Sequence, residues 1–205
     1  MYGIYLDTET TSTSPGQIAE LSLIVEDYET HQYIGAYNYF FKVDDMTDGA
    51  FKVHGFSKEM LESLSDGKRF GDRYPEFKQY LDDACLVAHN EAFDESFLSM
   101  ELWRLGISYS PKLRVCTMNY FKDIIKIPAR TMRYGRYKNP KLSEVLEYLH
   151  IDTAKVQEYT STLFKCDSSS FHDSRFDTTA IYVIINVLRD MNSGRTEWVQ
   201  KFCKA

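Results

Sequence analysis

The sequence predicts an α/β domain in which a mixed central β-sheet is flanked by α-helices. Strand-like segments come first and then alternate with segments of helical periodicity, which is the order typical of this fold class. Of the 205 residues, 43% are hydrophobic, which suffices for a folded core. No linker is long or polar enough to separate two domains. We expect one domain over residues 1–192, followed by a tail or short helix over residues 193–205.

Five segments have the composition of β-strands. Residues 18–27 and 33–43 are apolar and flank a polar turn around His31, which predicts a hairpin. The predicted strands are residues 2–7, 18–27, 33–43, 85–88 and 113–116.

Helical spacing of apolar residues predicts six helices. Ser57 is of the residue type that caps a helix N-terminus, and residues 176–191 have the strongest helical pattern. We interpret residues 152–171 as a surface loop, with an added helix or a lid as the alternatives. The predicted helices are residues 58–64, 73–83, 92–105, 118–127, 142–149 and 176–191.

Composition argues against several classes of protein. No apolar run reaches the roughly 18 residues that span a bilayer, and no secretory signal is present. The four cysteines are far apart and form no C-x-x-C pair, so we expect reduced thiols, a cytoplasmic location and no zinc knuckle. The net charge of −6 argues against nucleic-acid binding through bulk charge, but not against an enzyme whose metal ions supply positive charge. The cysteines are Cys85, Cys116, Cys166 and Cys203.

Four acidic side chains occupy positions that should face inward. Asp7 and Glu9 follow an apolar run and, being one residue apart in a strand, share a face. Asp94 precedes Phe97 by three residues on a predicted helix, and Asp177 begins the most apolar helix of the chain. Taken singly, each has an ordinary interpretation as a polar strand end or a first-turn cap.

His172 lies five residues before Asp177, a separation that does not place two side chains on one face of a continuous helix. The two can converge only if His172 lies in a loop ahead of the helix, and the serines at 168–170 favour such a loop. The alternative is a purely structural histidine.

Together, four inward carboxylates require cations, since they cannot share a pocket of low polarity otherwise. Oxygen ligands favour Mg²⁺ or Mn²⁺ over zinc. Two such ions stabilise the attacking and leaving oxygens of a phosphoryl displacement, and a histidine can accept the proton of the attacking water. The sequence therefore predicts a two-metal phosphodiesterase site.

Three motifs resemble those of the DEDD-type 3′→5′ exonucleases, in the subgroup that bears a histidine. This group includes RNase T and the epsilon proofreading subunit of DNA polymerase III. The segment from Val53 to Ser57 resembles the V-H-G-I-T/S segment of the same family. The motifs are Asp7-x-Glu9, His89-Asn90-x-x-Phe93-Asp94 and His172-x-x-x-x-Asp177.

The resemblance implies an RNase H-like fold and a defined chemistry. Asp7, Glu9, Asp94 and Asp177 would hold two Mg²⁺ or Mn²⁺ ions, and His172 would act as general base. Water would attack the terminal phosphodiester and release nucleoside monophosphates. Single-stranded DNA is favoured as substrate over RNA, with a DNA polymerase as a further partner and DNA repair as a context.

The resemblance also implies substrate contacts. The main chain of Thr10 and Thr11 would hold the terminal 3′-hydroxyl. His54, Phe56, Asn90 and Phe93 lie in the matched motifs, and the two phenylalanines would contact the last bases, although core packing is the alternative for Phe93. Two departures are Ser12, where the family often has Gly, and Ser174, where Ala is common.

Residues 128–141 contain five basic residues and no acid, with two tyrosines interleaved. In an acidic protein this composition predicts contacts with a nucleic-acid backbone and stacking on its bases, and the alternative is a solvated loop. The expected contacts are Arg130, Arg133, Tyr134 and Arg136.

Three further interpretations stay open. The chain could trim RNA, bind nucleic acid or a polymerase without catalysis, or hydrolyse a small phosphodiester. A zinc enzyme and a P-loop NTPase lack their ligand spacing and G-x-x-x-x-G-K-[ST] motif.

Overall fold

A computed structural model describes residues 1–130, 136–167 and 171–204. Its five-stranded sheet has the order β3-β2-β1-β4-β5. The β1–β2 and β2–β3 pairs are antiparallel, whereas β4 runs parallel to both β1 and β5, so the predicted mixed sheet and the predicted hairpin are confirmed. The strands are β1 (Tyr2–Thr10), β2 (Ile18–Asp27), β3 (Tyr33–Phe40), β4 (Ala84–Ala88) and β5 (Leu113–Cys116).

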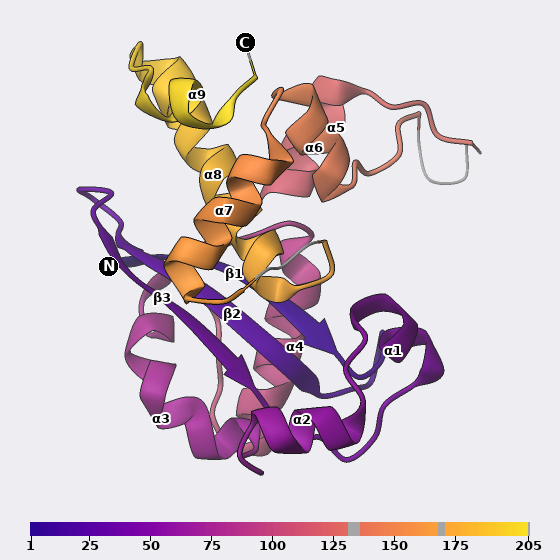
Figure 1. Ribbon diagram of the computed structural model, residues 1–205. Coiled ribbons are helices and arrows are strands. Elements are labelled where there is room, and N and C mark those ends of the chain that lie inside the picture. The colour runs from indigo at the N-terminus through magenta and orange to yellow at the C-terminus, as the bar shows by residue number, and fades with distance from the viewer. Residues whose placement is uncertain (131–135, 168–170, 205) are drawn as a thin grey trace.

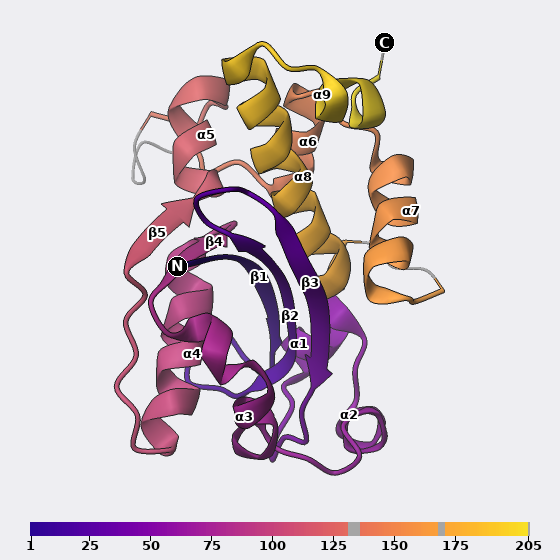
Figure 2. The ribbon, with the colours of Figure 1, turned by 90° about the vertical axis from the view of Figure 1, so that its left-hand side faces the viewer.

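Helices cover both faces of the sheet (Figure 1). They are α1 (Asp48–His54), α2 (Lys58–Leu64), α3 (Phe70–Leu81), α4 (Glu91–Arg104), α5 (Thr117–Ile125), α6 (Leu142–Tyr148), α7 (Thr153–Phe164), α8 (Ser174–Ser193) and α9 (Glu197–Phe202). Helices α3 and α4 pack on one face, and α5 to α9 gather on the other (Figure 2). The alternation of strand residues sets this division: Ile4 and Leu6 contact the first layer, and Tyr5 contacts the second.

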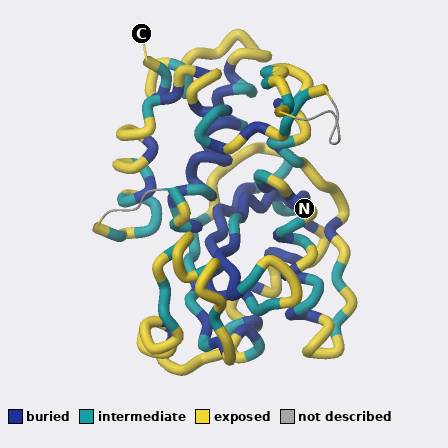
Figure 3. Tube along the Cα trace, turned by 90° about the vertical axis from the view of Figure 1, so that its right-hand side faces the viewer, coloured by how far each residue is buried: buried dark blue, intermediate teal, exposed yellow. Residues whose placement is uncertain are grey.

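Burial is deepest along the central strands and α8 (Figure 3). All four cysteines lie in the described part of the chain and are free thiols, as predicted. Among the described residues, no helix combines the length and the apolar composition that crossing a bilayer requires.

The interpretation of residues 152–171 as a loop is wrong, because residues 153–164 form α7. Asp152 caps this helix by accepting from the Ala154 N–H, and Val156 and Thr160 are fully buried. Tyr159 packs against Phe202 of α9, with ring centroids 5.2 Å apart. The buried face is narrow and mixes polar with apolar residues, which explains why periodicity alone did not reveal the helix.

Other differences concern ends and one short helix. β1 extends three residues beyond the predicted strand, to Thr10, whereas β3 ends at Phe40 rather than at residue 43. Helix α1 was not predicted, because none of its seven residues is buried and it therefore leaves no periodic pattern. Of the two alternatives for residues 193–205, a tail or a short helix, the structure has the helix, α9.

Polar side chains of β2 form hydrogen bonds that hold α8 against the sheet. Ser22 shares a hydrogen bond with Ser174, 2.6 Å between their hydroxyl oxygens, at the start of α8. Further along the strand, the Arg189 guanidinium donates to both oxygens of Glu26, at 2.6 and 3.0 Å, and Tyr5 donates to Glu26 as well. Because Glu26 is only 1% exposed, its charge depends on these donors.

We expect Arg189→Met to lower the free energy of unfolding by about 3 kcal/mol, because it leaves the Glu26 carboxylate buried without its cation. Urea denaturation followed by circular dichroism would measure the change. Adding Glu26→Gln to this variant should recover most of the loss, since the buried charge is then gone. An unchanged denaturation midpoint in Arg189→Met would contradict this role of the pair.

Candidate active site

Strand β1 carries Asp7 and Glu9 past the end of its pairing with β4. That pairing ends at Tyr5, while β1 continues to Thr10. Asp7 and Glu9 share the face of Tyr5, whose ring contacts Tyr182 of α8 with centroids 4.8 Å apart. Both carboxylates therefore face the side of the sheet that α8 covers.

Asp94 approaches β1 from the other layer, at the beginning of α4. Its Oδ1 accepts hydrogen bonds from the Thr8 backbone N–H at 3.1 Å and from the Thr8 hydroxyl at 2.8 Å. The carboxylate thus takes the place that a continuing β4 would occupy beside Thr8. Asp94 is 3% exposed and lies in the first turn of α4, where the helix dipole favours a negative charge.

Helix α8 brings Asp177 to the same end of β1. Asp177 lies in the first turn, and its Oδ2 accepts from the His172 backbone N–H at 3.3 Å. His172 lies ahead of the helix with a left-handed φ of 68°, which is the arrangement that the sequence required for the two residues to converge. Oδ1 of Asp177 is buried and has no hydrogen-bond partner among the described residues.

Three of the four predicted ligands converge closely. One ligand oxygen from each of Asp7, Glu9 and Asp177 lies within 4.8 Å of the other two. Oxygen donors at this spacing fit a hard divalent cation, and the unpartnered Oδ1 of Asp177 is the atom that a cation would satisfy. Asp94 stands next to them on the Thr8 side.

Burial and mutual repulsion disfavour the charged forms of these acids. Burial first, and then the charges of Asp177 and Asp94, raise the pKa of Asp7 well above its ordinary value. Burial and the neighbouring Glu20 carboxylate raise the pKa of Glu9 to about 9. Without a bound cation these acids therefore favour their protonated forms, and a cation that binds displaces the protons.

The pKa values of Asp94 and Asp177 are raised to about 7, mainly by burial. Hydrogen bonds oppose the rise in both cases: those from Thr8 lower the pKa of Asp94, and that from the His172 backbone lowers the pKa of Asp177. These donors stabilise the charged forms that metal ligation needs.

The segment around His54 is docked on the end of β1. His54 Nδ1 accepts from the Phe56 N–H at 3.1 Å, so Nε2 carries the proton and donates to the Thr10 carbonyl, 3.3 Å away. Burial lowers the pKa of His54, which favours this neutral form. The Thr11 carbonyl accepts from Thr47, which caps α1 and so ties that helix to the same loop.

A cavity of about 470 Å³ lies beside His172 and joins it to the His54 segment. Its wall combines cationic side chains with aromatic rings and the Asp173 carboxylate. Gln157 of α7 also contributes. The residues that carry this character are Lys52, His54, Phe56, Phe171, His172 and Arg175.

Asn90 and Phe93 stand at the start of α4, near Asp94, and are not among the described residues that line this cavity. Asn90 is exposed and precedes α4 with a left-handed φ of 73°. Phe93 is half-buried, with its ring centroid 4.8 Å from that of Phe97, which supports the interpretation as core packing.

The basic segment is described in part. Arg130 and Arg136 are exposed on the connection between α5 and α6, and the Arg136 guanidinium lies 5.5 Å from the centroid of the Tyr137 ring. Arg133 and Tyr134 lie outside the described residues. At the far end of the segment, His89 Nε2 is 3.0 Å from the Pro140 carbonyl, which ties this connection to the end of β4.

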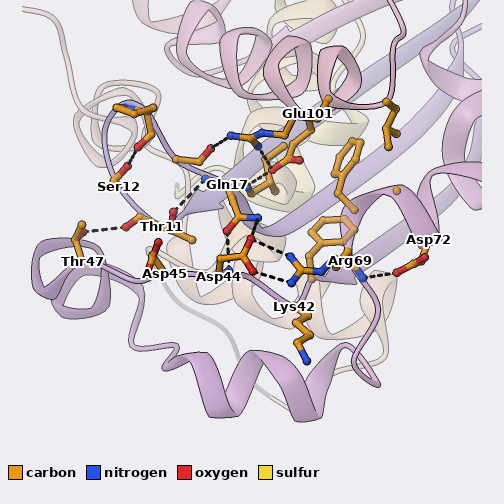
Figure 4. Close-up of a pocket in the computed structure, with 18 residues that line it drawn as sticks. Thr11, Ser12, Gln17, Lys42, Asp44, Asp45, Thr47, Arg69, Asp72 and Glu101 are labelled. Carbon is orange, nitrogen blue, oxygen red and sulfur yellow. Dashed lines mark hydrogen bonds and ion pairs between the residues drawn. The ribbon is translucent and has the colours of Figure 1, made fainter.

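A second cavity, of about 850 Å³, lies beside the loop formed by residues 11–17 and is shown in Figure 4. Its charged groups pair with one another: Arg69 donates to both oxygens of Asp44, and Arg104 lies 2.9 Å from Glu101. His172 lines the smaller cavity but not this one, and the four predicted ligand acids are among the described lining residues of neither cavity. We therefore centre the functional site on the acids and on His172, with the smaller cavity beside it.

The sequence analysis missed Glu20, a fully buried acid on β2 whose register partner is Glu9. A glutamate inside an apolar strand was the available signal. It also left Ser174 unexplained, whereas the structure shows its hydroxyl bonded to Ser22.

Comparison with known proteins points to one group of enzymes. A model of the RNase T family, whose description is exonuclease, matches residues 4–155. The DNA polymerase III subunit epsilon of Haemophilus influenzae is 31% identical over 159 residues, covering 74% of this chain and 58% of that protein. The same subunit of Rickettsia felis is 32% identical over 102 residues, covering 48% of this chain and 43% of that protein. The chain spans about half the length of these relatives.

The fold has counterparts among solved structures. Exonuclease I of E. coli, in a complex with a dT13 oligonucleotide, superimposes with a TM-score of 0.65 and 16% identity over 94% of this chain and 42% of that one. At this identity the likeness shows the RNase H-like fold alone.

We expect the metal-free protein to lose stability as the pH rises from 5 to 8. The carboxyl groups have pKa values near 4 when unfolded, against about 7 for Asp94 and Asp177 and about 9 for Glu9 when folded. The folded state therefore binds more protons than the unfolded state. The resulting stabilisation of the folded state is complete below pH 4 and is lost as the pH rises toward 9. Thermal unfolding in EDTA would measure the fall in midpoint, and Asp177→Asn should make it shallower. Mn²⁺ should raise the midpoint more at pH 8 than at pH 5, and a flat profile in EDTA would contradict the expectation.

Proposed function

The chain belongs to the RNase T family of exonucleases, and on that premise we propose that it is a metal-dependent 3′→5′ exonuclease acting on single-stranded nucleic acid. The observation that carries the proposal is the convergence of Asp7, Glu9 and Asp177 within 4.8 Å, next to a histidine held ahead of α8. We assign this activity to a domain over residues 1–192.

Asp7, Glu9, Asp94 and Asp177 would hold two Mg²⁺ or Mn²⁺ ions. When bound, such ions neutralise the carboxylates and stabilise the attacking and leaving oxygens of a phosphoryl displacement. The hydrogen bonds from Thr8 and from the His172 backbone keep Asp94 and Asp177 oriented for this task.

His172 would accept a proton from the water that attacks the terminal phosphorus. Imidazole suits this role because its protonation changes near neutral pH. The bond from phosphorus to the 3′-oxygen of the preceding nucleotide would break and release a nucleoside 5′-monophosphate. The 3′-oxygen of the shortened strand would then take a proton from solvent and become a hydroxyl. The terminal 3′-hydroxyl would be held by Thr10 and Thr11. His54 keeps this part of the chain in place through its hydrogen bond to the Thr10 carbonyl.

The cavity beside His172 supports a nucleotide as the group that is bound. Lys52 offers positive charge to a phosphate, and Phe56 offers a ring for stacking. We favour DNA as the polymer because the relatives are named as subunits of DNA polymerase III. A DNA polymerase as partner, and the cytoplasm as location, follow from the same names and belong to the proposal.

The first test uses DNA and RNA oligomers of equal sequence, labelled at the 5′ end, with Mg²⁺ or Mn²⁺. We expect a ladder that shortens from the 3′ end, faster on DNA, because water attacks only the terminal phosphodiester. EDTA and the double variant Asp7→Ala/Asp177→Ala should abolish it. Faster loss of the RNA would make the protein a trimming exoribonuclease. Tight binding of both polymers without cleavage would refute catalysis and favour a binding module.

The basic segment yields a second test. Replacing Arg130, Arg133 and Arg136 by Gln should raise KM several-fold and reduce the dependence of KM on salt, because fewer phosphates are neutralised on binding. The turnover number should stay unchanged. The measurement is KM on a labelled 15-mer from about 50 to 200 mM KCl. Identical KM values and slopes in wild type and variant would leave the segment as a solvated loop.

A further inference from the structure

Glu20 is a buried acid that the proposed reaction does not use. It is fully buried on β2, directly opposite Glu9 in the antiparallel register, on the face that α8 covers. Its Oε2 accepts from the Ser174 N–H at 3.4 Å, and its Oε1 has no hydrogen-bond partner among the described residues. A carboxylate in this setting is costly unless a cation lies close by.

Arg175 is the cation that faces Glu20. Its Nε lies 3.8 Å from Glu20 Oε1. The same guanidinium donates to both oxygens of Asp173, from Nε at 2.9 Å and from Nη2 at 2.6 Å. Its planar fork matches this two-point contact, which a lysine cannot reproduce. Arg175 therefore bridges a carboxylate fixed in the sheet and one in the turn that precedes α8.

The bridge ends next to His172. Asp173 is the N-cap of α8, and its side chain also accepts from the Arg175 backbone N–H at 3.0 Å. His172 has a left-handed φ of 68°, a conformation that costs free energy for a residue other than glycine and persists only when its surroundings enforce it. The one hydrogen bond described for His172 involves its backbone, so the turn rather than the ring determines where the imidazole lies.

We propose that Glu20 and Arg175 are positioning residues, which hold the His172–Asp173 turn next to the carboxylates of Asp7, Glu9 and Asp177. The inference rests on the proposed exonuclease activity. A small displacement of a general base is expensive, because a shift of about 1 Å can cost about 100-fold in rate.

Two variants test the bridge while keeping the fold. Glu20→Gln retains an acceptor for the Ser174 N–H and removes a buried repulsion, so its stability should not fall. Arg175→Lys keeps the charge and loses the fork. At saturating Mn²⁺ we expect kcat to fall about 10-fold or more in Arg175→Lys and severalfold in Glu20→Gln, with KM unchanged in both. The double variant should lose less than the product of the two, because both act through one bridge.

Arg189→Lys is the matched control. Arg189 joins the same two elements, α8 and β2, through the buried Glu26, but at the far end of the helix from His172. This variant should lower stability and leave kcat unchanged. It separates positioning of the turn from general weakening of the contact between α8 and the sheet.

Hydrogen–deuterium exchange of the metal-free protein gives a readout that is independent of activity. The amides of His172, Ser174 and Arg175, which donate to Asp177, Glu20 and Asp173 in turn, should exchange faster in Glu20→Gln and Arg175→Lys than in wild type or Arg189→Lys. Unchanged exchange would overturn the inference whatever the activity. An unchanged kcat would overturn it too, and a raised KM with unchanged kcat would make Arg175 a substrate contact instead. Inactive wild-type protein would refute the proposed function, while exchange would still decide whether the bridge holds the turn.

Discussion

The structure depends on a concentration of negative charge at the carboxyl end of β1. Asp7, Glu9 and Asp177 share one small volume, Asp94 stands beside them, and Glu20 adds a fifth acid, which is fully buried. Such a group raises the free energy of the folded chain unless cations or dipoles offset it. The fold supplies part of the offset by aiming the N-terminal turns of α4 and α8 at this end of the sheet, where their dipoles favour anions. Bound metal would supply the rest.

The space for this group comes from a mismatch in strand length. Because β4 pairs with β1 only as far as Tyr5, the outer residues of β1 meet helices instead of another strand. Thr8 gives its backbone N–H to Asp94 in place of a strand partner. The same extension sets Asp7 and Glu9 against α8 on the opposite face. If β4 continued in register beyond this point, it would fill the space beside β1. It would then separate Asp94, on one face of the sheet, from Asp7 and Glu9 on the other.

Local patterns in the sequence predicted what local forces determine. The bounds of β2, the Ser57 cap of α2 and the requirement that His172 precede α8 all follow from short stretches of chain. The features that the sequence analysis missed depend on contacts between distant parts of the chain. Glu20 became significant only through its register with Glu9, and α7 only through packing against α8, α9 and β3. The sequence analysis placed Asp94 with the other acids because all four face inward, whereas its hydrogen bond to Thr8 of β1 is a distant contact that no local pattern predicts.

The acids that lie between the sheet and α8 differ in the cation that neutralises them. Glu26 and Glu20 each face an arginine of α8, at 2.6 and 3.8 Å, and an arginine stays charged and in place at every stage of a reaction. Asp7, Glu9 and Asp177 face one another, and Asp177 keeps a buried oxygen without a hydrogen-bond partner in the described chain. An acid paired with an arginine is suited to holding two elements together, because its cation never leaves. Acids that depend on an exchangeable ion are suited to a site whose charge changes as substrate enters and product leaves. Two acids facing each other across β1 and β2, Glu9 and Glu20, thus differ in this respect, and Arg175 is what separates them.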